Sequence, residues 1–147
     1  MENEVVGFNN RMTEYAAALG IVQLSRLERF TNTRQKTAIT YGRALENHPD
    51  IIAPVIDLQA NHVFHQYTLR VTNEQRDAVA AKLRMKKIES ATYYPIPLPD
   101  LKPFTGSQEA DKIPVSRLLT REALSIPINP SIGRTATNRV ALALRGL

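Results

Sequence analysis

The chain has 147 residues, which is enough for one ordinary domain and too few for two. Its hydrophobic fraction of 43% and its charged fraction of 22% are typical of a globular protein and exclude wholesale disorder. Without cysteine, the chain can form neither a disulfide framework nor a thiolate zinc site. The net charge of +5 is spread over scattered arginines without a basic and aromatic stripe, so we expect no nucleic-acid partner.

No segment of the sequence has the pattern of a membrane span or of a secretion signal. The longest apolar stretch, residues 15–22, is far shorter than the roughly 20 residues that a membrane-spanning helix requires. No basic segment followed by an apolar one opens the chain, as it would in a signal peptide. We therefore expect a cytoplasmic protein with no membrane partner.

The first predicted element is a long amphipathic helix. From Met12 to Phe30 the apolar residues recur three or four positions apart, which places most of them on one helical face. Helical character continues to Leu45 and ends before Pro49, because the residue that precedes a proline avoids the helical conformation. One continuous helix and two helices with a kink near residues 31–33 fit the pattern equally well.

Short strands are predicted after this helix. Residues 51–56 form a short extended segment that Pro54 interrupts. Residues 65–71 alternate polar side chains with Tyr, Leu and Val, which is the pattern of a half-buried strand. Residues 88–93 form a further strand. The order strand, helix, strand predicts an α/β or α+β layered domain.

A helix over residues 74–86 is predicted between two of these strands. Thr72 and Asn73 are placed to cap its amino end. Its inward-facing residues are Val79, Ala80 and Leu83. The only dense basic run of the sequence closes it: Lys82, Arg84, Lys86 and Lys87. Cations at this end offset the negative end of the helix dipole, and an anion-binding face is the alternative interpretation.

Prolines mark the last third of the chain. Seven of the nine prolines lie between Pro95 and Pro130. Their spacing over residues 94–99 excludes a regular helix and a central strand, so this stretch is predicted to be a fixed, extended loop. A helix over residues 115–124 and a closing helix over residues 135–144 complete the prediction.

Few residue patterns point to chemistry carried by the chain itself. His62 and His65 are three positions apart, but no acidic ligand stands at metal spacing, so we expect no metal site. The sequence holds no glycine-rich phosphate loop and no nucleophile-elbow motif. Two features are unusual: the Gly-Asn-Asn-Arg entry to the long helix, and a tyrosine pair fixed by prolines.

These two features carry a resemblance to a known family. Residues 7–24 resemble the G-Y-N-Y-R-M-T-E-x-x-A-A-x-G-x-x-Q-L stretch of the DegT/DnrJ/StrS family. Residues 62–71 are similar to its H-x-Y-H-x-Y-x-I-R-V strand, and residues 93–98 to its [HY]-Y-P-x-P-L-H loop. Residues 123–130 are similar to its L-S-L-P-x-H-P segment. The landmarks follow the family's order and cover nearly the whole chain.

The resemblance implies an architecture. Members of this family are pyridoxal-phosphate-dependent sugar-nucleotide aminotransferases of fold type I, so residues 1–147 resemble the C-terminal small domain of such an enzyme. The expected fold is α/β (α+β layered), with a long N-terminal helix followed by a small sheet flanked by helices. We expect a long helical connector over residues 1–48 and a small α/β subdomain over residues 49–147.

The resemblance also implies site residues. Asn9 and Arg11 match the family's N-x-R turn, which reaches across the dimer interface toward the cofactor phosphate of the neighbour, and an amide with a guanidinium suits a phosphate. The alternative is an asparagine-rich helix cap with a surface arginine. Tyr93 and Tyr94 match the loop that faces the sugar-nucleotide pocket, and the alternative for them is a packed strand end.

Other features separate this chain from a complete enzyme. The family's cofactor-binding lysine belongs to a large N-terminal domain, and no lysine here has its serine- and phenylalanine-rich context. We therefore expect no covalent anchor for pyridoxal phosphate and no catalytic residue in this chain. Pro99 and Asn129 stand where the family has histidine, and residues 116–117 are Ser-Arg where it has Ala-Glu.

Two functions stay open on the sequence. The first is the C-terminal domain of an enzyme that transfers an amino group from an amino acid, typically glutamate, to a keto-sugar nucleotide, inactive without its large domain. The second is a non-catalytic module that self-associates or binds a partner. The expected partners are a second copy of the chain, as in a dimer, or a full-length relative, with a sugar nucleotide as the family's ligand.

Overall fold

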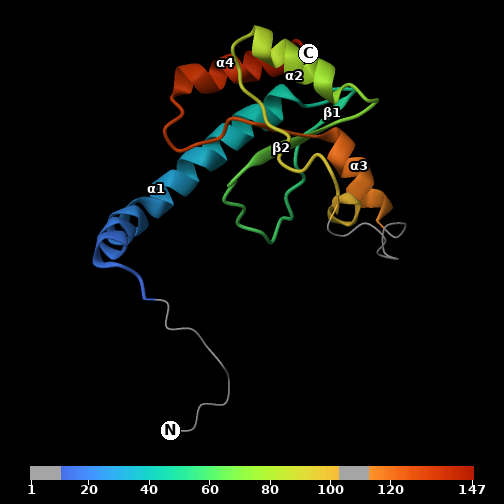
Figure 1. Ribbon diagram of the computed structural model, residues 1–147. Helices are drawn as coiled ribbons and strands as arrows, with labels where there is room; N and C mark the ends of the chain where they lie inside the picture. Colours follow the sequence, from blue (N-terminus) through green and yellow to red (C-terminus); the bar gives the residue numbers. More distant parts are fainter. Residues whose placement is uncertain (1–10, 103–112) are drawn as a thin grey trace.

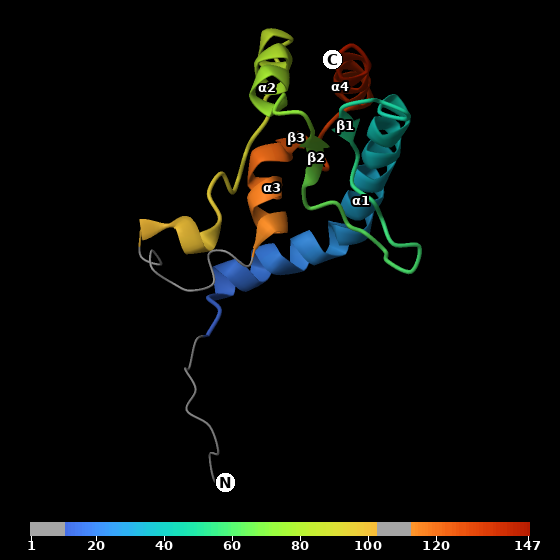
Figure 2. The ribbon, with the colours of Figure 1, turned by 90° about the vertical axis from the view of Figure 1, so that its right-hand side faces the viewer.

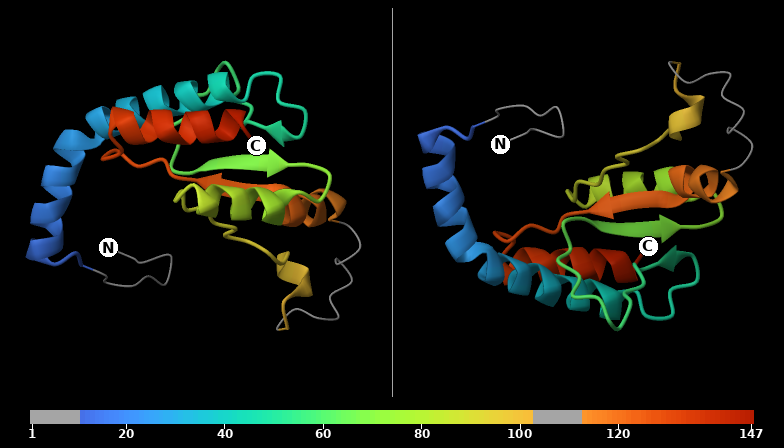
Figure 3. Two further views of the ribbon diagram at one scale, coloured as in Figure 1. Left: turned by 90° about the horizontal axis from the view of Figure 1, so that it is seen from above. Right: turned by 90° about the horizontal axis from the view of Figure 1, so that it is seen from below.

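The computed structural model describes residues 11–102 and 113–147, and Figure 1 shows its elements. In chain order they are α1 (Glu14–Ala44), β1 (Ile51–Ile52), β2 (Tyr67–Val71), α2 (Arg76–Met85), the 3-10 turn η1 (Leu98–Asp100), α3 (Pro114–Glu122), β3 (Ala123–Ile126) and α4 (Arg134–Arg145). The strands form one antiparallel sheet in the order β1-β2-β3. Figures 2 and 3 show α1 and α4 side by side on one side of this sheet and α3 on the other. The expected α+β layered fold is confirmed.

The central strand β2 gives the sheet two different faces. Its apolar residues alternate with polar ones, and they are fully buried: Tyr67, Leu69 and Val71. Across the strand pair, Leu69 lies opposite Leu124, and both belong to the hydrophobic core. Side chains one position away point to the other face, where Thr68 lies opposite Ser125. The predicted alternation over this strand is confirmed.

Helix α1 is one continuous helix of 31 residues, which decides between the two predicted alternatives. Thr13 caps its amino end by accepting a hydrogen bond from the backbone N–H of Ala16, over 3.3 Å. Figure 3 shows the helix curving along its length. Near the middle, the Thr33 hydroxyl donates to the carbonyl of Arg29 over 2.9 Å, a bond that favours bending. Neither α1 nor any other helix in the described part is both long and apolar enough to cross a membrane.

Only the last part of α1 enters the core. Its buried residues all come from the final eight positions: Thr37, Ala38, Tyr41 and Ala44. Tyr41 is completely buried, packs edge-to-face on Tyr67 with ring centroids 5.4 Å apart, and donates its hydroxyl to the carbonyl of Pro127 over 2.9 Å. Burial raises the pKa of the Tyr41 hydroxyl and raises the pKa of Tyr67 to about 12, so both phenols stay protonated at neutral pH.

The predicted cap of the second helix is wrong. Helix α2 begins at Arg76, two positions later than expected, and no side chain caps its amino end. Thr72 and Asn73 instead bond to Asp50 beside β1, through the Thr72 hydroxyl to its carbonyl and the Asn73 amide to its carboxylate. The inward-facing residues of this helix are as predicted, because Val79 and Leu83 are buried.

The predicted strand over residues 88–93 is also wrong. After α2 the chain turns through a positive φ of 55° at Lys87, and Ile88 donates its N–H back to the carbonyl of Leu83. Only Ala91 pairs with the sheet, through two backbone hydrogen bonds to Ser125 of 2.8 and 2.9 Å. The third strand is β3, whose first two residues fall within the helix predicted over residues 115–124.

Three smaller differences complete the comparison. The strand predicted over residues 51–56 is only two residues long, since Pro54 cannot donate to a sheet. The loop over residues 94–99 contains neither α-helix nor strand, as expected, but it leads into η1. The closing helix is confirmed within one residue at each end.

We expect Tyr41→Phe to lower the free energy of unfolding by about 1–2 kcal/mol, because it leaves the Pro127 carbonyl without its hydroxyl donor. Urea denaturation at neutral pH measures this change. The matched control is Tyr15→Phe on the same helix, where the tyrosine is exposed and a change within about 0.5 kcal/mol is expected. Equal effects of the two substitutions would show that the Tyr41 hydrogen bond contributes nothing.

Candidate functional site

A hollow lies on the face of the sheet opposite α1. The tyrosine pair, Tyr93 and Tyr94, and the proline loop, residues 94–99, border it on one side. The hollow has a volume of about 560 Å³. Thr68 and Ser125 lie at its floor, with their hydroxyls in a hydrogen bond of 2.8 Å. One wall is the loop over residues 93–98, and the other is α3.

The lining of this hollow is mainly apolar with a few hydroxyl groups. Its apolar wall residues are Pro95, Ile96, Pro97, Leu98, Leu101 and Leu119. Its hydroxyl groups come from Tyr93, Tyr94, Ser116 and Thr120 in addition to the floor pair. Pockets of this size, apolar with a few hydrogen-bonding groups that fix orientation, are typical of sites for small organic molecules.

The tyrosine rings are available to a ligand. Tyr93 is 56% exposed and Tyr94 is 78% exposed, and neither lies in a strand. The alternative of a packed strand end is therefore not what the structure shows for this pair. Ala91 holds the loop to β3 just before the tyrosines, and the prolines that follow restrict its backbone. The backbone on both sides of the tyrosines is thus restrained, while their rings stay exposed.

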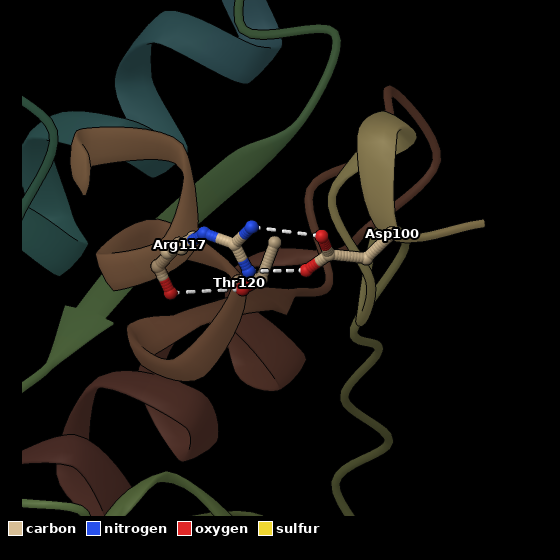
Figure 4. Close-up of polar contacts among 3 residues, drawn as sticks. All are labelled: Asp100, Arg117 and Thr120. Atoms are coloured by element: carbon tan, nitrogen blue, oxygen red, sulfur yellow. Dashed lines mark hydrogen bonds and ion pairs between the residues drawn. The ribbon is translucent and has the colours of Figure 1, made fainter. Parts of the chain in front are cut away.

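An ion pair joins the two walls of the hollow. Figure 4 shows the guanidinium of Arg117 on α3 facing the carboxylate of Asp100 in η1. Arg117 Nη2 donates to one carboxylate oxygen over 2.8 Å, and Nη1 donates to the other. The Thr120 hydroxyl donates to the backbone carbonyl of Arg117 over 2.9 Å, within the same helix. A two-pronged contact of this kind fixes direction as well as distance.

A second ion pair holds α3 to the sheet. Arg70 on β2 donates its Nε to Glu122 at the end of α3 over 2.9 Å, and its Nη2 lies 2.8 Å from the same oxygen. Arg76 at the start of α2 donates to the backbone carbonyl of Thr120. The wall that carries Arg117 is therefore tied to the rest of the fold, and the Asp100 contact extends this support to the loop.

The structure does not bring all the predicted site residues together. Tyr93 and Tyr94 line the hollow, whereas Arg11 is exposed just before α1. Figures 1 and 3 both place the start of α1 far from α3. Asn9 lies outside the described residues. Arg11 and the tyrosine loop thus lie in separate regions of the fold.

Sequence reasoning found the tyrosines and the proline loop but missed the floor of the hollow and the ion pair beside it. Asp100 and Arg117 are 17 positions apart, and no spacing rule for helices or strands connects them. The Thr68–Ser125 floor follows from the pairing of β2 with β3, a strand that was not predicted. The one available signal was the arginine at position 117, where the family has a glutamate.

Two other predictions concern charge and metal. The basic end of α2 contacts the carboxyl end of α4: Lys82 Nζ donates to the Leu147 carbonyl over 2.8 Å, and Lys86 Nζ to that of Ala143 over 3.3 Å. These lysines thus place positive charge at the carboxyl end of α4, where the helix dipole is negative. Among the residues that the structure describes, no three histidine, aspartate or glutamate side chains are grouped so that they could hold a metal ion.

Comparisons with known proteins agree on one family. The model of the DegT/DnrJ/EryC1/StrS aminotransferase family matches residues 1–145. The chain is similar to a UDP-N-acetyl-3-dehydro-alpha-D-glucosamine 3-aminotransferase of Acidithiobacillus ferrooxidans, at 32% identity over 143 residues, covering 97% of this chain and 38% of that protein. It is also similar to a pleiotropic regulatory protein of Geobacillus stearothermophilus, at 36% identity over 88% of this chain and 35% of that protein.

A solved structure shares both the fold and the sequence similarity. The crystal structure of Streptomyces venezuelae DesV in complex with a ketimine intermediate matches with a TM-score of 0.89 at 30% identity. The match covers 97% of this chain and 38% of that one. The chain thus spans between 35% and 38% of the length of these relatives.

We expect Asp100→Asn to loosen the proline loop without unfolding the protein. The backbone N–H groups of Asp100 and Leu101, which bond within η1, should exchange with deuterium faster, because the carboxylate no longer holds Arg117. The loss of global stability should be at most about 1 kcal/mol, since the pair is partly exposed.

The control for this variant is Asp77→Asn, which removes an exposed carboxylate paired with the adjacent Arg76. It should leave exchange in η1 unchanged. Hydrogen exchange followed by mass spectrometry or NMR makes the measurement. Equal exchange in η1 for both variants and the parent would show that the ion pair does not hold the loop.

Proposed function

Because the chain belongs to the DegT/DnrJ/EryC1/StrS aminotransferase family, we propose that it works as the C-terminal domain of a pyridoxal-phosphate-dependent sugar-nucleotide aminotransferase. One observation carries this proposal: the family match extends over residues 1–145, whereas the chain spans only 38% of the length of the Acidithiobacillus ferrooxidans aminotransferase. A domain of this extent would act together with the remaining part of such an enzyme.

The surface of α1 supports this proposal. Its first half leaves large apolar side chains exposed on several sides: Tyr15, Leu19, Ile21, Val22, Leu24 and Leu27. Exposed apolar residues that lie next to one another in this way mark a surface for another protein segment. We propose that residues 1–48 form a connector that the rest of the enzyme, or a second copy, covers, while residues 49–147 form the small subdomain.

A buried atom of an arginine side chain supports the same proposal. The Nε atom of Arg34 on α1 is buried and has no hydrogen-bond partner among the described residues. Burying such a donor without an acceptor costs about 1–3 kcal/mol, and more for a charged group. An acceptor supplied by the missing part of the enzyme would offset this cost.

The described residues fit one part of the cofactor. A guanidinium group suits the phosphate of the cofactor, and Arg11 carries such a group in the exposed segment just before α1. No lysine is among the described residues that line the hollow beside the tyrosines. Pyridoxal phosphate, when bound, supplies the electron sink for amino-group transfer. Its covalent attachment would come from a lysine of the large domain.

The residues of this chain would then bind and orient. Arg11, together with Asn9, would hold the cofactor phosphate of a neighbouring subunit, because the fold separates the start of α1 from the tyrosine loop. Tyr93 and Tyr94 would contact the sugar nucleotide, with phenol hydroxyls that hydrogen-bond sugar oxygens and rings that cover apolar faces. The Asp100–Arg117 pair would position the loop that carries them.

The exposed apolar side chains on the first half of α1 also favour a second function. A chain that exposes the first half of α1 would act as a non-catalytic module that self-associates or binds a full-length relative. Amino transfer needs the rest of the enzyme, whereas this function needs only the surface. The two proposals therefore differ in whether the chain restores activity when it is joined to a large domain.

A chimaera tests the enzymatic proposal. This chain replaces the matching segment of the Acidithiobacillus ferrooxidans aminotransferase, and bound cofactor is measured by absorbance after desalting. We expect the chimaera to retain pyridoxal phosphate, and Arg11→Ala to weaken its retention about ten- to a hundredfold through loss of a charge-assisted contact. Arg26→Ala, an exposed arginine on α1, is the control and should leave retention unchanged. Equal cofactor affinity in all three proteins would remove Arg11 from the cofactor site.

We expect the 147-residue chain alone to associate as its concentration rises. Light scattering should give a mass above 16.5 kDa, and placing a charge on the apolar half of α1, by Leu19→Glu with Val22→Glu, should return it toward that value. The control is Leu142→Glu, which changes an exposed leucine on α4. A monomer of 16.5 kDa across a wide concentration range would contradict the expectation.

A further inference from the structure

We propose that α1 and the amino end of α4 form a binding site for a phosphate-type oxyanion. A hollow of about 390 Å³ lies between the two helices. Its polar lining residues on α1 include Lys36, Thr37 and Thr40, and those on α4 are Arg134, Thr137 and Asn138. Figure 3 shows α4 beginning against the middle of α1, on the side of the sheet opposite α3. The site is thus separate from the tyrosine hollow and does not depend on the proposed function.

Two largely buried threonines line this hollow. Thr37 is 4% exposed and Thr137 is 7% exposed, and neither side chain has a hydrogen-bond partner within the described residues. Nearby on α1, Thr33 and Thr40 behave differently, because each donates its hydroxyl to the carbonyl four residues earlier. Thr37 and Thr137 therefore have protons to donate to a ligand in the hollow.

The charges around the hollow have one sign. Lys36 and Arg134 line it, both are exposed, and no aspartate or glutamate is among its described lining residues. Neither cation takes part in an ion pair in the described parts of the chain. Two cations near two hydroxyl donors, without a carboxylate, form a donor set suited to an anion.

The amino end of α4 adds to this positive potential. Its first turn contains no acidic residue, and its N-cap, Gly133, provides no side chain to accept a hydrogen bond. The first backbone N–H groups of a helix have no partner within the helix, and they attract negative charge. An arginine as the first helical residue adds positive charge where the helix dipole is already positive. A bound anion would relieve this repulsion.

The donor set favours phosphate over carboxylate. Hydroxyls and cations approach the hollow from two helices, and a phosphate offers them three or more acceptor oxygens in different directions. A carboxylate presents two oxygens in one plane. The volume of the hollow admits inorganic phosphate, and it also admits a phosphate that carries an organic group, such as the end of a nucleoside diphosphate.

NMR titration of the 147-residue chain with inorganic phosphate tests the proposal, with potassium chloride keeping the ionic strength constant. We expect saturable shifts of the backbone amide resonances over residues 36–40 and 134–138. Arg134→Gln and Thr137→Val should each weaken binding at least about fivefold. Thr137→Val keeps the shape of the side chain and removes no hydrogen bond, so it should fold as the parent does.

The control is Arg43→Gln, which removes an exposed positive charge from α1 outside the hollow and should change affinity less than about twofold. A second titration with uridine diphosphate distinguishes an organic phosphate from free inorganic phosphate as the ligand. Tighter binding than phosphate identifies an organic phosphate, and equal binding identifies the free ion. Absence of saturable shifts, unchanged affinity in Arg134→Gln and Thr137→Val, or equal weakening in Arg43→Gln would overturn the proposal.

Discussion

The packing of Tyr41 against Tyr67 holds the structure together. Tyr41 comes from the last turns of α1 and Tyr67 from the start of β2, and the hydroxyl of Tyr41 also binds the carbonyl that follows β3. One side chain thus connects the helix, the central strand and the segment that leads to α4. Because this contact lies near the carboxyl end of α1, the rest of the helix extends away from the core.

The same sheet serves the core on one face and the hollow on the other. β2 turns apolar side chains toward α1 and turns Thr68 toward the proline loop. A change of register by one residue would exchange these faces, since strand side chains alternate. The antiparallel pairing that aligns Leu69 with Leu124 also places Thr68 beside Ser125. The position of the hollow is therefore a consequence of how the core is packed.

The polar contacts around the hollow differ in kind from those of the core. Asp100 and Arg117 join an irregular loop to a helix, and Arg70 and Glu122 join that helix to the sheet. Partly exposed pairs contribute little to global stability, but they restrict the direction of the groups they join. The tyrosine loop is thus held by prolines, by a backbone bridge at Ala91 and by charge.

Local periodicity in the sequence is enough to predict the helical character of α1, the alternation over β2, the inward residues of α2 and the closing helix, whereas the continuity of α1 is known only from the structure. The sequence also carried the family resemblance, through motifs of adjacent residues. The packing of the chain sets which part of α1 is buried: its apolar first half is exposed, while Thr37 and Ala38, near its carboxyl end, are buried.

The third strand of the sheet is β3 and not residues 88–93, and no local sequence pattern favours β3. Residues 88–93 contain three strand-forming residues, Ile88, Thr92 and Tyr93, and β3 contains only Ile126. A strand exists only where a neighbour satisfies its backbone hydrogen bonds, and β1 already occupies one edge of β2, so only the other edge is free. β3 occupies this edge, which leaves residues 88–93 a single bridge at Ala91. The hollow, the Asp100–Arg117 pair and the α1–α4 contact likewise join residues distant in the sequence, and no local pattern records such contacts.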